Sequence, residues 1–107
     1  MLKNNTLYYT DSFFSGLLVE DEKLTIKNVK EVLLNEEIVN KLESLLSSGV
    51  CNLAHRCVSV YRDAIIINGN VYNICLSCGD YFINNEHRYI CNEEKIKDLL
   101  ETFKQWD

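Results

Sequence analysis

The dipeptide Asn68-Gly69 stands between two apolar, β-branched runs, and it restricts the possible folds of this chain more than any other feature. Both residue types tolerate the positive φ angles that a two-residue type I′ turn requires. The runs at 64–67 and 70–74 are therefore predicted to pair as an antiparallel hairpin.

The turn also predicts the register of that hairpin. If Asn-Gly is the two-residue loop, Ile65 lies opposite Tyr72 on the same face of the sheet. Continued by three further residues, the same register places Arg62 opposite Cys75. The sequence therefore predicts a cationic neighbour for this cysteine.

Two other segments show the spacing of amphipathic helices. Asn35 is a good N-cap, and apolar residues recur at helical spacing after it, so a helix is predicted over 36–47. Asn92 is expected to cap a closing helix with the same periodicity. The segment 29–34 combines β-branched residues with helix-like spacing, so that strand and helix both remain open.

Shorter apolar runs occupy the rest of the chain. The first 24 residues are expected to form one or two strands followed by a loop, and runs at 81–83 and 87–91 indicate a second hairpin. There is no repeat, linker or low-complexity tract. Residues 1–107 are therefore predicted to form a single α+β domain, in which a small antiparallel meander packs against two helices.

The charge balance restricts the partners of such a domain. With 16 acidic and 11 basic side chains, the formal charge is −5, whereas a protein that binds nucleic acid needs a basic stripe. No apolar run approaches the ~18 residues of a membrane span, and no export signal is visible. We expect a cytoplasmic protein with reduced cysteines and, if charge steers it, a basic partner.

The most pointed chemical feature is the pair Cys75-x2-Cys78, because two thiolates on a turn can hold one metal ion. Downstream, His87 and Cys91 would complete a four-ligand structural zinc site. The spacing does not select these two, since three upstream residues could serve instead: Cys51, His55 and Cys57. The alternative is that the cysteines are small buried packing residues.

A thiol redox protein is the second interpretation of the Cys-x2-Cys pair. Redox motifs of this kind open a helix after a strand, whereas this pair joins two predicted antiparallel strands. Nowhere does a local motif combine a nucleophile, a base and an orienting group. No catalytic residue is predicted, and the chain is not expected to be an enzyme.

One stretch resembles a family of small uncharacterised bacterial proteins. It extends from the predicted helix that precedes Cys57, through Tyr-Arg-Asp-Ala-Ile at 61–65 and the Asn-Gly turn, to the Cys-x2-Cys pair. The resemblance covers less than half of the chain, and the family has no settled activity. It implies that one constellation on adjacent strands is formed by Cys57, Arg62, Asp63, Cys75 and Cys78.

The chain is small and acidic, and no active-site motif can be recognised in it. This profile suggests an immunity-type protein, which neutralises a basic toxin such as a nuclease. The mechanism would be occlusion of the toxin's active site by a preorganised acidic surface. The candidate partner-binding residues are Glu20, Asp21, Glu22, Glu36, Glu37 and Glu43. No cofactor is expected in this case, and the zinc domain and the thiol redox protein are the alternatives.

Overall fold

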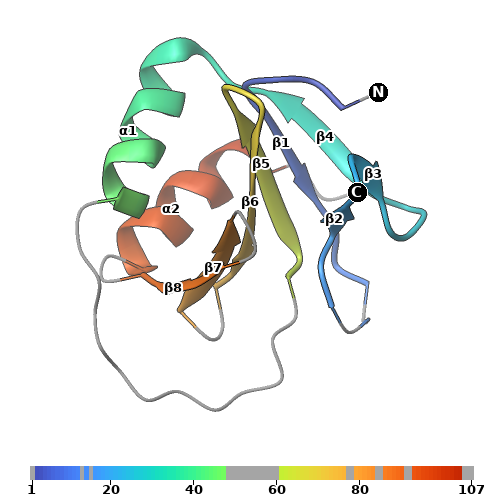
Figure 1. The fold of residues 1–107 in the computed structure, drawn as a ribbon. Coiled ribbons are helices and arrows are strands. Elements are labelled where there is room, and N and C mark those ends of the chain that lie inside the picture. Colours follow the sequence, from blue (N-terminus) through green and yellow to red (C-terminus); the bar gives the residue numbers. More distant parts are fainter. Residues whose placement is uncertain are drawn as a thin grey trace.

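The computed structural model describes residues 2–12, 14, 16–47, 61–76, 79–83, 86–90 and 93–104, and it has the predicted α+β class (Figure 1). Along the chain the elements are β1 (Thr6–Tyr9), β2 (Val19–Glu20), β3 (Lys23–Leu24), β4 (Lys30–Leu33), α1 (Glu36–Ser47), β5 (Asp63–Ile67), β6 (Asn70–Cys75), β7 (Asp80–Ile83), β8 (Glu86–Tyr89) and α2 (Glu93–Phe103). Among these described segments, no helix is long and apolar enough to cross a membrane.

The described strands form one six-stranded antiparallel sheet and a separate two-stranded ribbon made of β2 and β3. The order in the sheet is β4-β1-β5-β6-β7-β8, with every neighbouring pair antiparallel. From β5 to β8 the sheet is the expected meander. The N-terminal strand β1 extends it by pairing with β5 on one side and β4 on the other, an arrangement that no local sequence signal predicts.

The hairpin of β5 and β6 confirms the prediction from Asn68-Gly69. These two residues have φ angles of 51° and 79°, both in the left-handed region that a type I′ turn requires. Ile65 lies opposite Tyr72, as the two-residue turn predicts. Local turn chemistry therefore determines both the hairpin and its register.

The predicted first helix is also confirmed, since α1 covers the expected residues. The backbone N–H of Ile38 donates to the Oδ1 atom of Asn35 over 2.9 Å, which is the bond expected of an N-cap. The ambiguous segment 29–34 contains β4. It is a strand because β1 offers a pairing edge along the whole of Lys30–Leu33, and β-branched residues fit such a ladder well.

Both helices cover the same face of the sheet, which we call the helix face (Figure 1). Its core is continuous, and the buried members are Leu7, Tyr9, Leu34, Val39, Leu42, Leu46, Ile65, Ile67, Tyr72, Ile74, Tyr81, Ile83, Ile90, Ile96 and Leu100. The hydroxyl of Tyr81 donates to the carbonyl of Leu46 over 2.9 Å and so ties β7 to the end of α1. Apolar packing thus closes this face.

The opposite face, which we call the ribbon face, is covered by the segment that contains β2 and β3 (Figure 1). Its core is smaller, and the buried members are Tyr8, Leu18, Val19, Ala64 and Ile66. Every residue of β5 is buried, because this strand is covered on both faces. Among the described residues, this face has cavities beside the ribbon.

Candidate functional site

The ribbon carries three exposed carboxylates at its tip, Glu20, Asp21 and Glu22, which we call the acidic turn. Asp21 and Glu22 have φ angles of 52° and 62°, so the two strands are joined by a two-residue turn in the left-handed region. This conformation is uncommon for residues other than glycine, and for glutamate in particular it is unfavourable. The sequence predicts a loop here, whereas the structure has a hairpin tip.

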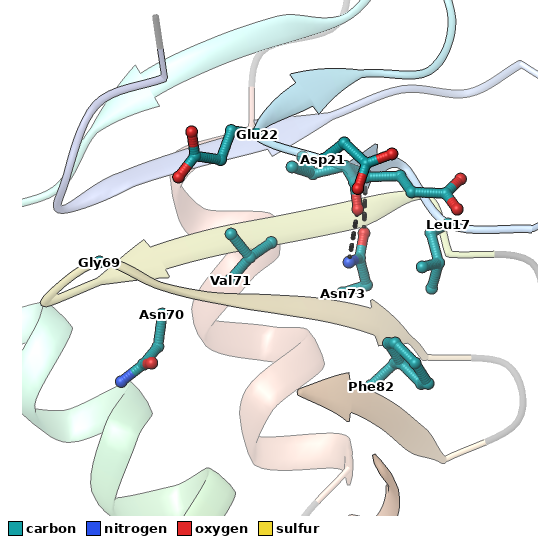
Figure 2. A pocket seen from close by; sticks show the side chains of 10 residues that line it. Leu17, Asp21, Glu22, Gly69, Asn70, Val71, Asn73 and Phe82 are labelled. Carbon is teal, nitrogen blue, oxygen red and sulfur yellow. Dashed lines mark hydrogen bonds between the residues drawn. The ribbon is translucent and has the colours of Figure 1, made fainter. Parts of the chain in front are cut away.

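A buried asparagine holds the ribbon on the sheet. Asn73 of β6 is only 3% exposed, and its side-chain amide pairs with the backbone of Val19. The Val19 N–H donates to Oδ1 over 2.9 Å, and Nδ2 donates to the Val19 carbonyl over 3.0 Å (Figure 2). Because both ends of the amide are engaged, the base of the acidic turn has one position relative to β6.

A second polar tie lies on the other side of the ribbon. The Thr25 hydroxyl donates to the carbonyls of Leu17 and Leu18 over 2.7 and 3.1 Å, and the Thr25 N–H also donates to Leu18. The chain leading into β2 is therefore bonded to the chain leaving β3. The acidic turn projects from a closed, internally bonded unit.

Two cavities, of about 340 and 500 Å³, open beside the acidic turn. Four residues line both of them: Asp21, Glu22, Gly69 and Val71. The smaller cavity is also lined by Leu17, Val19, Glu20, Asn70, Asn73 and Phe82. The larger cavity is also lined by Leu2, Asn4, Lys23 and Ile66. Figure 2 shows the side chain of Val71 pointing toward the turn, whereas that of Asn70 points away.

The two cavities differ in charge. All three carboxylates of the acidic turn line the smaller one, and none of the described basic residues does. Lys23 lines the larger one beside two of the carboxylates. With the other described residues, the acidic turn forms no ion pair. The smaller cavity is therefore an anionic pocket whose charge is not neutralised within the described part of the protein.

The remaining predicted acidic residues, Glu36, Glu37 and Glu43, lie on α1, and we call them the helix carboxylates. The first two are in the first turn of the helix, where negative charge complements the helix dipole. Burial raises the pKa of Tyr72 on the helix face, and the charge of Glu43 raises it further. The structure therefore separates the six predicted residues into two groups on opposite sides of the sheet.

The predicted zinc ligands are only partly within the described residues. Cys75 is fully buried at the end of β6 and packs with Tyr61, Leu17 and Phe82. His87 belongs to β8, while Cys51, His55, Cys57, Cys78 and Cys91 lie outside the described residues. The described part contains no group of three or more potential ligands. The zinc site and the thiol redox pair both stay predictions.

The constellation implied by the family resemblance is only partly within the described residues, because Cys57 and Cys78 lie outside them. Asp63 lies opposite Ile74, which packs on the helix face, whereas the next residue, Cys75, points to the other face. The printed pairing ends at Asp63 and Ile74, and the same register continued by one residue places Arg62 opposite Cys75, as the turn predicts. Strand alternation thus places Asp63 and Cys75 on opposite faces of two adjacent strands, and the full constellation stays a prediction.

Asp63 has an ion-pair partner that no local sequence pattern predicts. The Nζ atom of Lys104, just after α2, lies 2.6 Å from its Oδ1 atom, and the two side chains are 6% and 4% exposed. Lys104 also lies 5.9 Å from the ring centre of Tyr9 and 3.5 Å from Glu101. Burial raises the pKa of Asp63, and the charge of Lys104 opposes this effect. A single lysine at a helix end gives no sequence signal of such a pair.

Comparison of the chain with protein-family models, with curated proteins and with solved structures finds no match. The function is therefore inferred from the geometry of the chain itself. The acidic turn and its two cavities are the feature of that geometry with the clearest binding chemistry.

Proposed function

We propose that this chain is a non-catalytic binding protein of the immunity type, which neutralises a basic toxin, such as a nuclease, by covering its cationic active site. The observation that carries the proposal is the acidic turn, which is exposed, lacks ion pairs with other described residues and is clamped in place by Asn73. The chain as a whole is acidic, with a formal charge of −5.

The mechanism follows from charge complementarity. A toxin that cleaves a nucleic acid needs a cationic cleft for its polyanionic substrate, and an anionic protrusion competes for the same cleft. A turn already held in one conformation loses little conformational entropy when it binds. The hydrogen bonds between Asn73 and Val19 supply this preorganisation, because they attach the turn to the central sheet.

The helix carboxylates contribute the same charge but have a structural explanation. Two of them begin α1 beside its N-cap, and all three lie on the far side of the sheet from the acidic turn. A single compact partner surface that covers one group therefore leaves the other group free. This separation provides a matched control for the proposed binding surface.

The test uses two variants with the same change in charge, from −5 to −2. In one variant, Glu20→Gln, Asp21→Asn and Glu22→Gln neutralise the acidic turn. In the other, Glu36→Gln, Glu37→Gln and Glu43→Gln neutralise the helix carboxylates. Each variant and the wild-type chain are titrated against any purified basic toxin encoded beside the gene of this protein. Both binding and toxin inhibition are measured at moderate salt.

We expect the first variant to bind at least about tenfold more weakly, which corresponds to about 1.4 kcal/mol, and the second to bind like the wild type. The loss should appear mainly as slower association that depends on salt if the carboxylates act at the rim of the interface. Equal losses in both variants would mean that only net charge matters. Absence of binding by the wild-type chain would contradict the proposal.

A further inference from the structure

The smaller cavity beside the acidic turn has a chemistry more specific than a negative surface. Its walls are provided by four apolar side chains from the ribbon segment and the sheet: Leu17, Val19, Val71 and Phe82. Its rim carries the three carboxylates of the acidic turn. A ligand complementary to this arrangement needs an apolar stem and a cationic head.

The polar side chain in the cavity wall does not change this requirement. Both ends of the Asn73 amide are bonded to the backbone of Val19, so the amide has little to offer a ligand. The Asn70 side chain points away from the acidic turn (Figure 2). The polar recognition left to a ligand is therefore that of the carboxylates.

We infer that the cavity of about 340 Å³ receives an arginine side chain of the protein partner. The methylene stem of arginine packs on Val71 and Leu17, and its guanidinium reaches the carboxylates of the acidic turn. Arginine suits this place better than lysine, because its planar head pairs with carboxylates through two parallel hydrogen bonds and stacks on an aromatic ring such as Phe82. This inference rests on the proposed function and names the partner chemistry that it requires.

The larger cavity is less suited to the same side chain. It is also apolar, with Leu2 and Ile66 in its walls, but Lys23 lines it together with two of the carboxylates. The lysine charge repels a second cation there. The difference between the cavities makes the larger one a control for the smaller one.

The first experiment uses a small probe in place of the partner. N-acetyl-arginine methylamide is titrated into the isotopically labelled protein, and amide chemical shifts are followed by NMR in the millimolar range. We expect saturable shifts at Val19, Val71 and Asn73, and none with the citrulline analogue, which has the same shape without the charge. Equal shifts with both compounds, or none with arginine, would overturn the inference.

Two cavity-filling variants locate the binding. Leu17→Trp fills the smaller cavity and is expected to weaken arginine binding at least tenfold, whereas Leu2→Trp fills the larger cavity and is expected to leave it unchanged. Thermal unfolding of both variants checks that they are folded. Leu17→Phe, a smaller change at the same wall that keeps every carboxylate, replaces Leu17→Trp if that variant is unfolded.

The same variants separate the two proposals when they are titrated against the toxin. If the wild-type chain and Leu17→Trp inhibit the toxin equally, the inference of an arginine pocket is wrong, and the proposed function is still supported. If no toxin is bound but the arginine probe binds saturably, and Leu17→Trp abolishes this probe binding, the cavity does bind arginine and the proposed function is wrong. Loss of both probe and toxin binding in Leu17→Trp alone supports both.

Discussion

The two faces of the sheet are covered in different ways. Helices α1 and α2 close the helix face through a continuous core of leucine, isoleucine and tyrosine side chains. The ribbon face has a smaller core and depends on side-chain hydrogen bonds, above all those between Asn73 and Val19. Beside the ribbon, which is tied to the sheet by these polar contacts, two cavities open. The continuous core thus lies on one face, and the surface that we propose for binding lies on the other.

The buried ion pair is expected to give the largest effect. Lys104→Met leaves the Asp63 carboxylate buried without its partner, and we expect a loss of about 3 to 5 kcal/mol in the free energy of unfolding at neutral pH. The double variant Asp63→Asn with Lys104→Met removes both charges and should recover most of this loss. Urea unfolding of the three proteins measures both effects.

The pH dependence of that loss has a definite sign. The pKa of Asp63 is raised above its ordinary value of 3.8, so the folded protein holds this proton more tightly than the unfolded chain does. The contribution of Asp63 to the free energy of unfolding is therefore fully present below pH 3.8 and is lost as the pH rises through the pKa of Asp63 in the folded protein. Removal of Lys104 strengthens this trend, and the variant should lose less stability in acid than at neutral pH. Equal losses at both pH values would contradict the assignment.

Truncation of the helix-face core is expected to be nearly as costly. Leu42 is fully buried on α1, and Leu42→Ala should lower the free energy of unfolding by about 2 to 5 kcal/mol. Leu24→Ala is the comparison on the ribbon face, where the side chain is only partly buried, and its loss should be smaller. If Leu24→Ala costs as much as Leu42→Ala in urea unfolding, the two faces are closed equally well.

Removal of the hydrogen bonds between Asn73 and Val19 is expected to have an intermediate effect on stability and a specific effect on the ribbon. Asn73→Ala leaves the N–H and C=O of Val19 without these bonds, and we expect a loss of about 1 to 3 kcal/mol. Hydrogen exchange at the Val19 amide should become faster. Asn70→Ala, at the exposed end of the same strand, is the control and should change neither the stability nor the exchange rate. If the Val19 amide stays protected from exchange in Asn73→Ala, the Asn73 side chain does not hold the ribbon.

The smallest expected effect is at the N-cap of α1. Asn35→Ala removes the acceptor for the Ile38 N–H and should cost about 1 kcal/mol, measured by urea unfolding. Because the cap lies on the helix side, toxin binding by the folded variant should not change. Asn40→Ala, at an exposed position within the same helix, is the control and should not destabilise the protein. Weaker toxin binding in Asn35→Ala would show that the faces are coupled.

Local signals predicted the parts of the fold that need no distant partner. Asn68-Gly69 determined the central hairpin and its register, and Asn35 with the apolar repeat after it determined α1. The sequence also identified the acidic turn as a candidate partner surface, because a run of carboxylates is visible without a structure. It did not show that two of these residues form the tip of a ribbon.

Contacts between distant segments were decided only in the folded protein. The segment 29–34 is a strand because β1 lies beside it, and β1 lies there because it also pairs with β5. The tie between Asn73 and Val19 and the pair of Asp63 with Lys104 join residues that no local pattern connects.

The physical reason is the range of the forces involved. Turn geometry, helix capping and side-chain periodicity act within a few residues, so the sequence alone determined the hairpin and α1 of this protein. The face that a side chain occupies follows from strand alternation and from what packs above the sheet. Only the tertiary structure therefore decided that the six acidic candidates form two groups, and that one of them stands over a cavity.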